Sequence, residues 1–85
     1  MKFNGAVILE QGINFAIVLV KKSVLSSNIE TNKSRDFFQP YFSGSILVLA
    51  AQDSSGRFEY KGRKDLVDFL AKLHPSQIPW KEYTI

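Results

Sequence analysis

The 85-residue chain contains no cysteine. Disulfide bonds, thiolate metal sites and thiol redox chemistry are therefore excluded, as are disulfide-stapled secreted mini-proteins. Long apolar runs are also missing, since the longest run near the N-terminus spans only residues 15–20. A membrane-spanning helix needs roughly 20 such residues, and no small-x-small cleavage site follows the run. We therefore expect a soluble protein of the cytoplasm that does not enter a membrane.

The excess of positive charge is small as well. Eleven Lys and Arg against eight Asp and Glu give a net charge of +3, whereas dedicated nucleic-acid domains usually carry a basic stripe or a stronger imbalance. The chain is rich in apolar residues: 45% are apolar and 13% are aromatic. This composition is typical of a folded protein. The length predicts a single small domain over residues 1–85.

Two apolar runs rich in β-branched residues begin the chain, at residues 6–9 and 15–20. Gly12 lies between them and adopts positive φ without steric cost, so a tight hairpin is predicted. A strand that is apolar on both faces must be covered on both faces. The second strand is therefore expected to be central in its sheet, or to bury one face in a dimer.

Two further strands are predicted on either side of a turn at residues 53–56. Residues 45–51 are again apolar on both faces. Residues 57–61 alternate, so that Phe58 and Tyr60 face one side and the charged side chains face the other. This alternation predicts an edge strand guarded by charge.

An amphipathic helix is predicted next, because Leu66, Phe69, Leu70 and Leu73 recur at helical spacing and Pro75 ends the pattern. The tail, residues 75–85, is predicted to be extended and docked. Its apolar side chains favour folding back onto the sheet or onto a partner.

The segment from residue 30 to residue 42 is predicted to form one or two turns of helix, capped by Ser34 or Thr31. Pro40 lacks an amide donor, so an irregular aromatic segment is expected to follow. The predicted fold class is therefore α+β. It has a four-stranded mixed or antiparallel sheet, ordered strand-strand-short helix-strand-strand-helix, with one main amphipathic helix and an extended C-terminal tail.

Residues 44–74, read as strand, strand and helix, are similar in element order to the closing unit of thioredoxin-like domains. The Cys pair of that family is absent, and Gly44-Ser45 stands where the family has a proline before the third strand. The opening hairpin differs too. The resemblance therefore implies no site residues in this chain.

Signatures of catalysis are missing: there is no nucleophile motif, zinc-ligand spacing or glycine-rich phosphate loop. We expect no enzyme activity, cofactor or metal. His74 is expected to cap the preceding helix, and Asp65 and Asp68 to be solvated surface charges. A small-molecule cleft near Tyr41, Tyr60 and His74 is retained as a third hypothesis.

The aromatic segment and the tail carry the main functional hypothesis. A domain this small has difficulty burying four clustered aromatic rings, a tryptophan and three apolar strands together. We expect a non-catalytic protein-interaction module that forms a homodimer or binds another protein. The expected contact residues are Phe37, Phe38, Tyr41, Phe42, Ile78, Trp80 and Tyr83.

A small nucleic-acid-binding domain is the alternative, through a basic cluster of Arg57, Lys61, Arg63 and Lys64. Basic residues interleaved with aromatic rings can bind single strands by phosphate contact and base stacking. Strand alternation places the neighbouring rings on the opposite face from the basic residues. This alternative is therefore not favoured.

Overall fold

The computed structural model describes residues 1–10 and 12–85. Its strands are β1 (Lys2–Glu10), β2 (Ile13–Leu19), β3 (Ile46–Gln52), β4 (Phe58–Lys61) and β5 (Lys81–Thr84). Its helices are α1 (Lys22–Leu25), α2 (Asn28–Phe38) and α3 (Lys64–Ala71), with the 3₁₀ turns η1 (Gln39–Phe42) and η2 (Pro75–Gln77).

The strands form one mixed sheet in the order β4-β3-β2-β1-β5. Strands β2 and β3 run parallel, joined through α1, α2 and η1, and the other neighbours are antiparallel. The predicted α+β class with a mixed sheet is confirmed. The predicted count of four strands is wrong, because the tail supplies a fifth strand that pairs with the first half of β1, from Lys2 to Gly5.

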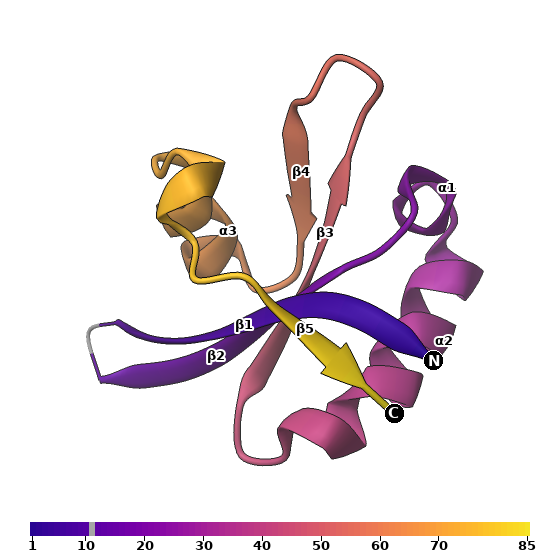
Figure 1. The fold of residues 1–85 in the computed structure, drawn as a ribbon, viewed down its shortest axis with the longest axis horizontal. Helices are drawn as coiled ribbons and strands as arrows, with labels where there is room; N and C mark the ends of the chain where they lie inside the picture. The colour runs from indigo at the N-terminus through magenta and orange to yellow at the C-terminus, as the bar shows by residue number, and fades with distance from the viewer. Residues whose placement is uncertain (11) are drawn as a thin grey trace.

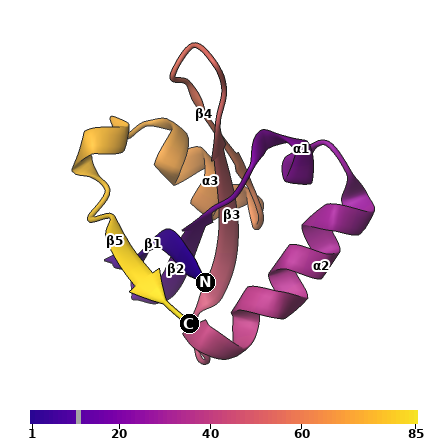
Figure 2. The same cartoon turned by 45° about the vertical axis from the view of Figure 1, so that its right-hand side comes forward.

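Helices cover both faces of the sheet (Figures 1 and 2). On the first face, α1, α2 and η1 pack against residues that include Leu47 and Leu49 of β3. On the second face, α3 and the segment after it pack against residues that include Val48 and Ala50. The central strands β2 and β3 are buried on both sides, as their apolar runs predict.

Helix α2 is longer than the one or two turns predicted, with 11 residues from Asn28 to Phe38. Its N-cap is Ser27, whose hydroxyl accepts a hydrogen bond from the Glu30 amide at 3.3 Å, so the predicted caps Ser34 and Thr31 are wrong. Thr31 is buried inside the helix and donates to the Val24 carbonyl at 2.8 Å. The protein thus has two main helices, where the sequence predicted one.

The hairpin at the start of the chain closes on the pair Glu10 and Ile13, and Gly12 has φ of +75°, as predicted. The other residue of that turn, Gln11, lies outside the described residues. Strand β4 is an edge strand, again as predicted. Phe58 and Tyr60 pack on the second face, opposite to their charged neighbours.

Candidate functional site

Six aromatic rings on the first face form a connected cluster. The centroids of contacting rings lie between 4.8 and 6.0 Å apart, within the range of favourable aromatic pairs. The members come from β1, α2, η1 and β5. They are Phe3, Phe37, Phe38, Tyr41, Phe42 and Tyr83.

Exposure falls steeply across this cluster. Phe38 and Phe42 are buried against the sheet, and Tyr83 is half-buried over Phe3. Phe37 and Tyr41 lie outside them with their rings tilted against each other, and are 48% and 52% exposed. We call this pair the aromatic surface. Five of the seven predicted contact residues therefore come together, but only these two face solvent.

The remaining two predicted contact residues lie on the opposite face of the sheet. Ile78 is buried in the second cluster. Trp80 is half-buried and stacks on Phe58, with 5.8 Å between ring centroids. The seven residues therefore do not form a single surface.

Strand β1 holds two exposed residues that the sequence analysis missed. Val7 is 50% exposed and Leu9 is 66% exposed, whereas the alternating residues Ala6 and Ile8 pack on the second face. Their apolar run predicted cover on both faces, which proves wrong for this half of β1.

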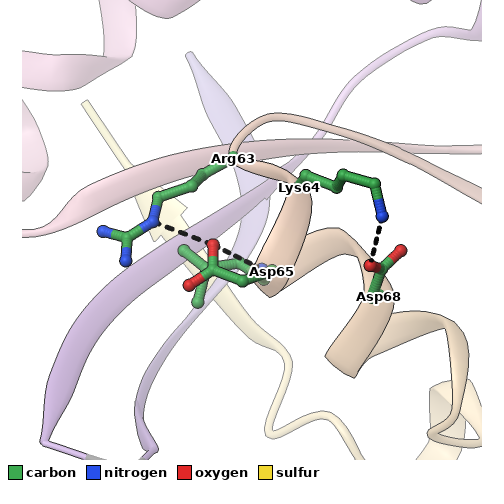
Figure 3. A network of polar contacts seen from close by, with 5 residues as sticks. Arg63, Lys64, Asp65 and Asp68 are labelled. Atoms are coloured by element: carbon green, nitrogen blue, oxygen red, sulfur yellow. Dashed lines mark hydrogen bonds and ion pairs between the residues drawn. The ribbon is translucent and has the colours of Figure 1, made fainter.

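Two residues of the basic cluster are paired within the chain, as Figure 3 shows. Arg63 Nε lies 2.8 Å from an Asp65 carboxylate oxygen, and Lys64 Nζ lies 2.9 Å from Asp68. The hydrogen bond to Asp68 raises the pKa of the Lys64 ammonium. Exposed pairs of this kind contribute little stability, but they neutralise the two cations locally.

The other two basic residues point to different places. Lys61 Nζ donates to the Leu25 carbonyl at 3.1 Å and to Asn28 Oδ1 at 3.2 Å, so it joins β4 to the α1–α2 junction. Arg57 lies exposed at the end of the β3–β4 turn. The four residues therefore do not form a basic stripe.

The β3–β4 turn is organised by Asp53. Its Oδ1 accepts hydrogen bonds from the Ser55 hydroxyl at 2.7 Å and from the amides of Ser55 and Arg57, both at 2.9 Å. The Ser55 hydroxyl is the main reason that the pKa of the Asp53 carboxyl is lowered, followed by the Arg57 amide. These bonds account for the charged form of Asp53 without any ligand.

The three residues of the small-molecule hypothesis are not gathered around one cleft. Tyr41 belongs to the aromatic surface. Tyr60 borders a surface depression of about 310 Å³ beside α3. Burial raises the pKa of its phenol, whose oxygen has no hydrogen-bond partner among the described residues. His74 caps the N-terminus of η2, because its Nδ1 accepts from the Ser76 amide at 3.2 Å. Its predicted role at the end of α3 is therefore corrected.

Within residues 1–10 and 12–85, no three His, Asp or Glu side chains gather where they could hold a metal ion. No helix in the same part of the chain has both the length and the apolar character to cross a membrane. Comparisons of the chain with protein-family models, curated proteins and solved structures return no match.

Proposed function

We propose that this protein is a non-catalytic interaction module that associates with itself. The observation that supports the proposal is the placement of four large apolar side chains, each about half exposed or more. Val7 and Leu9 stand in β1, and Phe37 and Tyr41 form the aromatic surface. Scattered exposed apolar residues are ordinary, but adjacent pairs on a chain this small favour a protein contact.

The ionic groups support the same proposal. Arg63, Lys64 and Lys61 are each engaged by a neighbour in the same chain. Arg57 is exposed but lies apart from the other three at the β3–β4 turn, so the four cations do not line up along one surface. We therefore do not extend the proposal to nucleic acid, whose binding depends on several cations aligned along a backbone.

Sedimentation equilibrium from about 10 µM to about 1 mM protein tests the proposal across the range of weak affinities. We expect a reversible, concentration-dependent dimer that persists at high salt, because the contact is apolar. A chain that stays monomeric over this range would contradict the proposed function.

A further inference from the structure

One stretch of sheet edge has no strand beside it. Strand β5 pairs with β1 only from Lys2 to Gly5. Among the described residues no strand or loop backbone pairs with the outer edge of β1 from residue 6 to residue 10. Unpaired strand edges are templates for another strand, because their amides and carbonyls lack partners.

The hydrogen bonds at the chain ends identify the groups on this edge. Met1 and Ile85 exchange both backbone hydrogen bonds, at 2.6 and 2.8 Å. In an antiparallel ladder such pairs recur at every second residue. The odd-numbered residues of β1 therefore direct their backbone groups toward the outer edge. Beyond Gly5 these are Val7 and Leu9, whose side chains are also exposed.

We infer that the outer edges of β1 in two copies of this chain pair antiparallel about a two-fold axis at Ile8. The inference rests on the proposed self-association and names its interface. In this register Val7 of each copy faces Leu9 of the other. Val7 then donates one backbone hydrogen bond to the Leu9 opposite it and accepts one from it, and Leu9 does the same with the Val7 opposite it. The backbone amides and carbonyls of both residues are thereby paired in both copies. A register centred on Val7 instead would place Leu9 opposite the partner's Gly5, whose backbone groups already bond to Lys81.

The side chains fit the same register. Val7 and Leu9 of both copies form one apolar group on the first face, and apolar cross-strand pairs stabilise a sheet. The segment's one charged residue, Glu10, lies opposite the partner's Ala6. The partner's Lys81, which pairs with Gly5, is one position further along that edge, so unlike charges come close. A second copy therefore suits this edge in hydrogen bonding, apolar contact and charge.

The contact is small. A single strand pair with two apolar side chains from each copy falls among interfaces below about 1,200 Å² of total buried area, which form weak or transient complexes. The dimer is therefore expected to be weak and reversible. It extends the five-stranded sheet through β1 of both copies.

Cysteine crosslinking tests the register directly, because the chain has no cysteine of its own. The two Ile8 residues form a non-hydrogen-bonded pair with Cα atoms about 4.5 Å apart, within the range that a disulfide spans. We expect Ile8→Cys to form a covalent dimer under mild oxidation at least about tenfold faster than two matched variants. These are Asn14→Cys on β2 and Glu59→Cys on the β4 edge.

Charge swaps at exposed positions provide a second test that does not depend on a half-buried residue. The variant Val7→Lys/Leu9→Lys places lysines opposite each other in both pairs, whereas Val7→Lys/Leu9→Glu places lysine opposite glutamate. The dimer dissociation constant of the first variant should exceed that of the second by about tenfold, since like charges repel and unlike charges attract across strands. The variant Phe37→Ser/Tyr41→Ser tests the other exposed apolar pair as the contact. The control is Glu59→Lys on the β4 edge, which lies in neither pair and should leave the dissociation constant of the wild type unchanged.

Hydrogen exchange supplies the third measurement. The amides of Val7 and Leu9 should exchange more slowly as protein concentration rises, while the amide of Ile8, which faces β2, should not change. Two outcomes would overturn the β1 interface and leave the proposed self-association standing. In the first, the protein dimerises but Ile8→Cys crosslinks no faster than the two cysteine controls. In the second, Phe37→Ser/Tyr41→Ser dissociates the dimer and Val7→Lys/Leu9→Lys does not. A wild-type monomer at all concentrations would overturn both.

Discussion

The two exposed strand edges of the sheet, that of β4 and that of the far half of β1, differ in length and in charge. Strand β4 is short, carries the charged residues Glu59 and Lys61, and begins directly after a turn fixed by Asp53. The far half of β1 carries the exposed residues Val7 and Leu9, and among the described residues no strand pairs with its outer edge. Charge and brevity are the usual protections of an edge strand. The difference agrees with the proposed pairing, in which the β4 edge stays unpaired and the β1 edge receives a second copy.

The largest effect is expected from removing residues 81–85. This truncation deletes β5 and the ring of Tyr83, which stacks on Phe3 at 5.2 Å. The free energy of unfolding should fall by about 3 kcal/mol from lost aromatic packing and strand pairing, measured by urea denaturation.

The same truncation extends the bare edge along all of β1, so the folded fraction should associate more strongly. Tyr83→Ala in the full chain is the matched control, since it removes the ring but keeps the strand backbone. If the truncated protein were as stable as the full chain, β5 would not contribute to the fold.

A smaller effect is expected from Gly5→Ala, at the junction between the covered and bare halves of β1. A Cβ atom there would lie 2.9 Å from the Ile17 carbonyl oxygen and 3.3 Å from the Tyr83 ring. The overlap should lower the free energy of unfolding by about 1–3 kcal/mol. Thermal unfolding followed by circular dichroism measures this loss of stability, and Asn14→Ala is the neutral surface control. An unchanged melting temperature would contradict the close approach of Ile17 in β2 and of Tyr83 in β5 to Gly5.

Lys61→Met tests the guarded edge. It keeps most of the aliphatic stem and removes the donor that joins β4 to Leu25 and Asn28. The loss should be about 1 kcal/mol, measured by urea denaturation with an unchanged slope. Lys72→Met, on the exposed face beyond α3, is the control. If the two variants were equally stable, the hydrogen bonds of Lys61 would not stabilise β4.

The smallest effect is expected from Asp53→Asn in the β3–β4 turn. The pKa of Asp53 is lowered from its usual 3.8, so its charged form stabilises the folded state above that pH. The variant should melt at a slightly lower temperature than the wild type at pH 7. The difference should shrink as the pH falls below 3.8 and the wild-type carboxylate takes up a proton. Ser54→Ala in the same turn should show no such pH dependence.

The sequence predicted the central strands well because their apolar runs leave few alternatives. The alternation of Phe58 and Tyr60 likewise predicted the β4 edge. Strand β5 was missed because Lys81–Thr84 lacks an apolar run and becomes a strand only by pairing with β1. Its identity depends on a partner about 80 residues away in sequence, which local patterns do not encode.

The extent of α2 was missed for a related reason. Its first two turns are polar, so the sequence predicted only one or two helical turns within residues 30–42. In the structure the Ser27 cap and the buried Thr31 hydroxyl stabilise a helix that begins at Asn28. The candidate contact residues were predicted as a group by composition. Which of these residues are exposed, however, depends on the face of the sheet against which each element packs. Trp80 and Phe37 lie on opposite faces for this reason.

The pairing of β5 with β1 also links local stability to association. A strand that is paired with one neighbour over only four residues, as β5 is, opens more readily than the core. Each opening of β5 would lengthen the bare edge of β1 from residues 6–10 to the whole strand, which begins at Lys2. Under the proposed pairing, heat or mild denaturant would therefore favour association at temperatures or concentrations that leave the core folded, and a bound β5 would restrict the contact to residues 6–10 of β1.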